Sequence, residues 1–163
     1  MDETTLTVGD MVLRAVIALV CGAVIGLNRD LHHKGAGLRT FGLVALGTAG
    51  IAMGMLVFVH SSPDNVGRVA QGVLTGIGFL GAGVILRRAD GERITGLTTA
   101  AAIWFVAGLA FLCGLGQLVL VAILLGLSLL VLLFGRTVER LVEQVFGADP
   151  RDPAKDDFSD GGP

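Results

Sequence analysis

The sequence predicts an all-α membrane protein, a bundle of five transmembrane helices with the N-terminus outside and the C-terminus in the cytoplasm. Apolar residues make up 53% of the 163 residues and charged residues only 16%, whereas globular domains carry roughly 25% charged residues. The 25 glycines are also typical of membrane helices, because small residues let helix backbones approach closely. Finally, the apolar residues fall into five long runs, which favour membrane helices over the core of a soluble domain.

Each apolar run is long enough to cross a bilayer as a helix. The runs have 17 to 19 residues, and at 1.5 Å per residue they match a hydrocarbon core of about 30 Å. They cover residues 11–27, 41–59, 69–86, 98–115 and 118–134. A tight hairpin at Gly116-Gln117 is predicted to separate the last two. The transmembrane domain is therefore predicted over residues 11–134, after an extracytoplasmic segment over residues 1–10.

The basic residues predict the orientation. Of the 12 lysines and arginines, 10 fall on one side of the predicted membrane, and the positive-inside rule makes that side cytoplasmic. An odd number of spans agrees with an outside N-terminus and an inside C-terminus. The first residues are acidic and lack the basic region of a signal peptide, so the first run is expected to stay in the membrane. The 10 residues are Arg29, Lys34, Arg39, Arg87, Arg88, Arg93, Arg136, Arg140, Arg151 and Lys155.

The chain after the last run divides into two parts. Residues 135–146 keep apolar residues at helical spacing with charges opposite, which predicts an interfacial helix. Residues 147–163 are rich in Pro, Gly and Asp and are expected to form a disordered cytoplasmic tail.

An internal repeat is visible when the chain is compared with itself at an offset of 59 residues. Each copy holds a glycine-rich helix, a basic loop, a Gly-Leu-x-Thr sequence and a second helix. Such a parallel two-helix repeat would be related by an axis along the membrane normal. Because Gly, Ala and Leu match one another easily in membrane helices, duplication and chance remain equal alternatives. Gly22, Ala23, Leu27, Arg29, Gly37, Leu38 and Thr40 match Gly81, Ala82, Leu86, Arg88, Gly96, Leu97 and Thr99.

The glycines predict close contacts between helices. Gly76-Ile-Gly78-Phe-Leu-Gly81 has the spacing of a dinucleotide-binding loop, but it lies in the middle of a predicted span, which excludes that function. Small-residue faces support packing within the bundle or between copies of the chain, and both alternatives stay open. The candidate packing residues are Gly22, Gly26, Gly72, Gly76, Gly78, Gly81 and Gly83.

Few polar side chains fall inside the predicted spans. Arg14 is expected to pair with Asp10, four residues earlier, or to reach the interface. Gln71 and Thr75 share one face of the third run, where hydrogen bonding between helices is favoured over a polar path. No Asp or Glu lies deep in a run, which argues against a proton-coupled or cation-coupled carrier. The two cysteines are interpreted as packing residues.

Polar residues next to the membrane are the other functional candidates. Asp30 could contribute to a cation site, whereas the adjacent His32-His33 is a weak metal signal because neighbours do not share a helical face. No set of nucleophile, base and orienting group is visible, so the chain is not expected to be an enzyme. No metal ligand set is assigned. Thr98 and Thr99 are expected to cap the fourth helix. The remaining candidates are Asn28, Arg29, Arg39, Thr40 and Arg88.

Four motifs occur in order along residues 11–133. They are Gly22-Ala-Val-Ile-Gly26-Leu-Asn-Arg29-Asp30, Lys34-Gly-Ala-Gly-Leu-Arg-Thr40, Gly76-Ile-Gly-Phe-Leu-Gly-Ala-Gly-Val-Ile85, and Gly96-Leu-Thr-Thr-Ala-Ala101 with Trp104. Together they resemble the MgtC/SapB family. The resemblance implies a bacterial inner-membrane protein linked to growth at low magnesium and, in intracellular pathogens, to survival in macrophages. It also implies partners among membrane complexes, such as the F-type ATP synthase and cation-pumping ATPases.

Two departures from the family pattern bear on function. Asn28-Arg29-Asp30 stands where the family typically has Glu-Arg-Glu, which puts a cation role for the triplet in doubt. Many members also carry a soluble domain after the last span, whereas only about 30 residues follow here. Arg14 and Gln71 do match family positions.

Two functions follow as hypotheses. The first is a regulator of other membrane complexes that supports magnesium homeostasis. The second is a Mg²⁺ transporter with a path lined by Gln71, Thr75 and Asp30. The scarcity of membrane carboxylates favours the regulator, because Mg²⁺ needs oxygen ligands and sheds water reluctantly. No cofactor is expected, with bound Mg²⁺ as the alternative. The net charge of −2 gives no attraction to nucleic acid.

Overall fold

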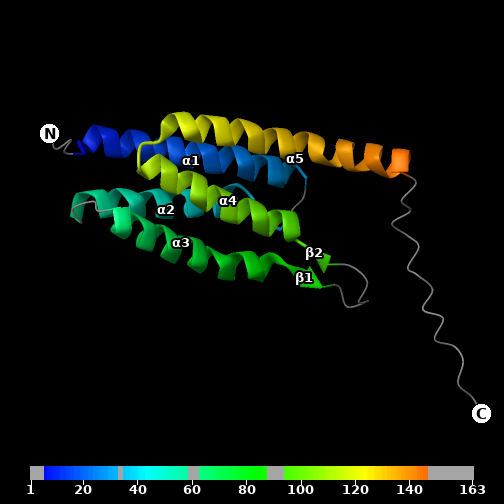
Figure 1. Ribbon diagram of the computed structural model, residues 1–163, viewed down its shortest axis with the longest axis horizontal. Coiled ribbons are helices and arrows are strands. Elements are labelled where there is room, and N and C mark those ends of the chain that lie inside the picture. Colours follow the sequence, from blue (N-terminus) through cyan, green and yellow to red (C-terminus); the bar gives the residue numbers. More distant parts are fainter. Residues whose placement is uncertain (1–5, 33–34, 59–62, 88–93, 147–163) are drawn as a thin grey trace, which may run out of the picture. The chain divides into compact units, whose positions relative to one another are not determined.

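The computed structural model describes residues 6–32, 35–58, 63–87 and 94–146 (Figure 1). It contains five helices and one pair of two-residue strands. The prediction of an all-α chain with five helices is confirmed, and the short strand pair was not predicted. The predictions for His33, Lys34, Arg88 and the tail over residues 147–163 lie outside the described residues. The helices are α1 (Val8–Leu31), α2 (Leu38–Phe58), α3 (Pro63–Val84), α4 (Leu97–Gly114) and α5 (Leu118–Phe146), and the antiparallel strands are β1 (Leu86–Arg87) and β2 (Ile94–Thr95).

Four of the five helices are long and apolar enough to cross a membrane. They are α1, α2, α4 and the part of α5 over Leu118–Gly135. The third helix is not in this set, because six glycines together with Arg68 and Gln71 lower its mean hydropathy. A fifth crossing, which the sequence predicts, therefore depends on α3.

The first four helices form one compact unit with the beginning of α5, over Met1–Leu127. Within it α1 packs along α2 and α4, α2 packs along α4, and α3 packs mainly along α4. Consecutive helices of this unit run in opposite directions, and the strand pair joins α3 to α4 (Figure 1). Its centre is built of small side chains, which is why the helices approach closely. The fully buried residues include Ala18, Ala45, Ala49, Ala52, Val106 and Ala107.

Helix α5 continues without a break into a second unit that begins at Ser128. Apolar side chains along this second half are exposed, among them Val131 at 69% and Phe134 at 56%. Exposed apolar residues on a helix of this composition suit contact with lipid. The residues predicted as an interfacial helix belong to this same continuous helix.

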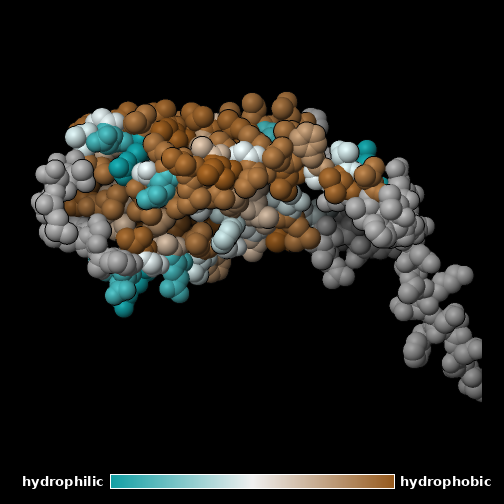
Figure 2. Space-filling model, turned by 45° about the horizontal axis from the view of Figure 1, so that its top comes forward, coloured by the Kyte–Doolittle hydropathy of each residue, from teal (hydrophilic) through white to brown (hydrophobic). Residues whose placement is uncertain are grey.

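Apolar side chains also cover much of the molecular face shown in Figure 2. Leu43 of α2 is 71% exposed and Phe79 of α3 is 82% exposed. Apolar surface of this extent would promote aggregation in water, whereas in a bilayer it would contact the lipid tails.

Candidate functional site

A buried arginine joins α1 to α4 at the end of the unit where α1 ends and α4 begins. Arg29 is 5% exposed and Thr99 is 2% exposed. The Nη2 atom of Arg29 donates a hydrogen bond to the Thr99 hydroxyl oxygen at 2.8 Å. Burying a charged group is costly unless it is hydrogen-bonded, so this contact fixes the distance between the two helices.

The prediction that Thr98 and Thr99 cap α4 is wrong. The N-cap is Gly96, which has a left-handed backbone (φ 94°) and no side-chain capping bond. Because the helix starts at Leu97, both threonines lie inside its first turn, where Thr98 is exposed and Thr99 faces Arg29. Glycine is required at position 96 both by this φ and because a Cβ there would collide with the Val84 carbonyl oxygen.

Asp30 lies next to Arg29 and caps α2. Its Oδ2 atom accepts a hydrogen bond from the backbone N–H of Leu38, the first residue of α2, at 2.8 Å. The first N–H groups of a helix have no partner within the helix, and a negative charge there is favoured by the helix dipole. Gly37 touches the same carboxylate, because a Cβ on Gly37 would overlap it. The residue predicted for a cation site thus serves in the α1–α2 connection.

The other predicted polar residues of this end are less engaged. Asn28 is half-buried, and its carbonyl oxygen lies 2.7 Å from Nδ1 of His32. Arg39 and Thr40 are exposed in the first turn of α2. Within the described residues, no group of three or more His, Cys, Asp or Glu is placed to hold a metal ion.

Arg14 performs a capping role at the opposite end of α4. Its Nη1 atom donates a hydrogen bond to the Gly114 carbonyl oxygen at 2.8 Å, across 100 residues of sequence. The last carbonyls of a helix have no internal partner and favour a cation. The guanidinium also lies against Gly116, where φ is 80° and a Cβ would be 2.9 Å from Cζ of Arg14. Asp10, the expected local partner, forms a capping box with Thr7, and the Thr-x-x-acid spacing could have indicated that box.

The predicted packing glycines separate into three groups. A Cβ at Gly22 would lie 2.7 Å from the Phe41 carbonyl oxygen, and one at Gly26 would lie 2.9 Å from Cα of Leu38. These two glycines therefore permit the close α1–α2 contact. On α3, a Cβ at Gly81 would make an ordinary contact with Cβ of Ala100 at 3.7 Å. For the remaining four, an added Cβ would meet no atom of another described segment within 4 Å; they are Gly72, Gly76, Gly78 and Gly83.

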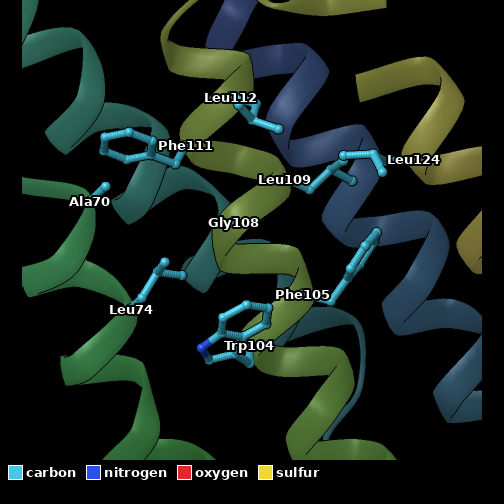
Figure 3. Close-up of a pocket in the computed structure, with 9 residues that line it drawn as sticks. All are labelled: Ala70, Leu74, Trp104, Phe105, Gly108, Leu109, Phe111, Leu112 and Leu124. Atoms are coloured by element: carbon cyan, nitrogen blue, oxygen red, sulfur yellow. The ribbon is translucent and has the colours of Figure 1, made fainter. Parts of the chain in front are cut away.

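Two apolar cavities border α3. A pocket of about 290 Å³ lies between α3 and α4, and Figure 3 shows Leu74 pointing from α3 towards α4 near Trp104. An open groove of about 680 Å³ separates α2 from α3, with Thr48 on its α2 wall and Gly72 on its α3 wall. The predicted polar residues Gln71 and Thr75 are exposed on α3 and line neither cavity.

Comparison with known proteins identifies the family. The family model described as the MgtC family matches residues 15–141, which include most of every helix. The chain belongs to the MgtC family. Together with the four helices able to cross a bilayer, this membership makes it a membrane protein.

Curated relatives extend the same similarity. Protein MgtC of Salmonella typhimurium is 47% identical over 106 residues, covering 65% of this chain and 44% of that protein. Protein SrpB of Synechococcus elongatus is 44% identical over 123 residues, covering 66% of each. Protein MgtC of Brucella abortus is 45% identical over 100 residues, covering 61% of this chain and 40% of that protein. The chain thus spans less than half the length of the MgtC relatives that it matches. No solved structure matches it.

Proposed function

We propose that this protein supports magnesium homeostasis in a bacterium by acting on other membrane complexes, without catalysis and without itself moving Mg²⁺. The proposal that the protein does not move Mg²⁺ rests on one observation: three charged side chains form hydrogen bonds that connect or cap helices. Arg29 holds α1 to α4, Asp30 caps α2, and Arg14 caps the end of α4. The two guanidinium groups have no acceptor atom and cannot ligate Mg²⁺, and the carboxylate of Asp30 already accepts the Leu38 N–H, which leaves it poorly placed to exchange with a hydrated ion. The magnesium part rests on family membership alone.

We further propose five crossings of the inner membrane, with the N-terminus outside. The alternating directions of α1 to α4 in Figure 1 support this arrangement. So does the charge distribution, since 10 of 12 basic residues fall on the side assigned to the cytoplasm. The inner membrane follows from the family resemblance.

We also propose that α1–α2 and α3–α4 are copies of one helical hairpin. Their second helices begin at Leu38 and Leu97, which are 59 residues apart. Within each pair, one glycine faces the same backbone position of the partner helix. Gly22 faces the Phe41 carbonyl, and Gly81 faces the Ala100 carbonyl, again 59 residues later on both sides.

The partner is proposed to be a larger membrane assembly, with an ATP synthase or a cation-pumping ATPase as the first candidates from the family resemblance. The exposed glycines of α3 offer a surface on which another helix could approach closely. A second copy of the chain is the alternative occupant of that surface.

Two measurements test the proposal together. The first is Mg²⁺ flux into liposomes that hold the purified protein, alongside the Asp30→Ala variant. The second is growth at low magnesium of a bacterium whose own family member has been deleted. We expect growth to be restored without flux above that of empty liposomes.

The contrary outcomes are distinct. Flux that disappears in Asp30→Ala while the variant remains folded and inserted would replace the regulator with a transporter. Failure to restore growth by a protein that accumulates in the membrane would remove the magnesium role itself.

A further inference from the structure

Two helix contacts between the proposed copies α1–α2 and α3–α4 should be equivalent under the duplication, and they differ. In one of them α1 packs along α4, and the side chains of Cys21 and Cys113 are neighbours there. Both cysteines are buried, at 4% and 0% exposed. The duplication proposed above relates α1 to α3 and α4 to α2, so the corresponding contact between the copies is α3 along α2.

That corresponding contact is open. The groove of about 680 Å³ lies where α3 would meet α2. Leu80 of α3, 59 residues after Cys21, is 52% exposed. A Cβ at Gly54 of α2, 59 residues before Cys113, would meet no atom of another described segment within 4 Å.

The side chains on the two walls of the groove are complementary in size. Gly72 and Gly76 line the α3 wall, and Leu43 and Ile51 line the α2 wall. At the corresponding positions of the α1–α4 contact the sizes are exchanged, because α1 holds Leu and Ile and α4 holds alanine; the Ile on α1 is half-buried, whereas the Leu is 53% exposed. The α1 residues are Leu13 and Ile17, and the α4 residues are Ala102 and Ala110. Small residues facing large ones let two helices interlock without voids.

We propose that α3 has a second, closed position, in which it packs along α2 as α1 packs along α4. Closure brings Gly72 and Gly76 against α2 and eliminates the groove. Occupation of the groove by a partner helix or a lipid chain and closure of α3 then exclude one another. The inference rests on the proposed duplication and is independent of whether the protein moves Mg²⁺.

The native cysteine pair supplies the design of the test. In a Cys21→Ser/Cys113→Ser background, Gly54→Cys and Leu80→Cys place a new pair at the corresponding positions. The matched control combines Gly54→Cys with Phe79→Cys, because Phe79 is the neighbouring α3 residue and is 82% exposed. Membranes are treated with a membrane-permeable copper–phenanthroline oxidant at the dose that cross-links half of the native pair. The thiols that remain are then counted by the gel shift of a maleimide polymer.

We expect the Gly54→Cys/Leu80→Cys variant to lose both thiols within single chains and the Phe79 control to keep them. Adding Gly76→Leu should lower the yield at least several-fold, because it obstructs close approach; in the open position a Cβ at Gly76 meets no atom of another described segment within 4 Å. No intrachain cross-link, a cross-link only between two chains, or a yield unaffected by Gly76→Leu would each overturn the closed position. None of these results would change the flux or growth results that decide the proposed function.

Discussion

Replacing one glycine tests the close contact between α1 and α2. A Cβ at Gly22 would lie 2.7 Å from the Phe41 carbonyl oxygen and 2.8 Å from Cβ of Ala45, whereas ordinary contacts begin at 3.4 Å. The Gly22→Ala variant therefore requires the two helices to separate locally by about 0.7 Å. Neither of these neighbours can rotate away, because one is backbone and the other is a single methyl group.

Overpacking of this kind costs about 1–3 kcal/mol. For a chain of this size, each kcal/mol lowers the melting temperature by about 2–4 °C, so we expect a fall of about 2–12 °C. The assay is heating in mild detergent with a thiol-specific fluorophore, because Cys21 and Cys113 are buried until the helices separate.

The matched control is Gly126→Ala on α5, where an added Cβ would meet no atom of another described segment within 4 Å. This variant should melt at the temperature of the parent or slightly above it, because alanine favours helix more than glycine does. If Gly22→Ala and Gly126→Ala melt at the same temperature, the assignment of Gly22 to a tight interface is refuted.

Three further substitutions test two polar contacts and the glycine that begins α4. Thr99→Val removes the hydroxyl that accepts a hydrogen bond from a buried arginine and should lower the free energy of unfolding by about 1–3 kcal/mol, measured by the same thiol-fluorophore melting assay. Thr99→Ser keeps the hydroxyl and should recover most of the lost stability. Arg14→Leu removes the cap on the Gly114 carbonyl, so amide exchange in the last turn of α4 should accelerate while the first turn is unchanged, and uniform acceleration would contradict a local role. Gly96→Ala forces a β-carbon against a carbonyl at positive φ and should lower the amount of folded protein in membranes, whereas equal accumulation would show that the α3–α4 connection can rearrange.

The helices were predictable from the sequence because an apolar run long enough to cross a bilayer indicates a helix by its length and composition. Each predicted run overlaps one observed helix, and the hairpin at Gly116 lies between α4 and α5. For α3, in contrast, composition does not establish a membrane crossing. Its glycines carry little hydropathy, although they suit helix contacts.

The roles of the polar residues were much harder to predict. From the sequence, Arg14 was expected to pair with Asp10 or to reach the interface, but the carbonyl that accepts its hydrogen bond is 100 residues away. Such a partner has no side-chain signature, since any helix end offers free carbonyls. Asp30 was considered for a cation site because it lies in a dense polar stretch next to the membrane. Only the position of the Leu38 N–H shows that it caps a helix.

The long separation between Arg14 and its acceptor has a consequence for the order of synthesis. The arginine is made first, and Gly114 follows 100 residues later. At about 5–20 residues per second, the interval is on the order of 5–20 s. During that interval the arginine of α1 has to be satisfied by water, lipid headgroups or the insertion machinery. We therefore expect chains arrested before Gly114 to keep α1 close to the translocon and chains arrested well after it to release α1, a difference that site-specific crosslinking from α1 would record.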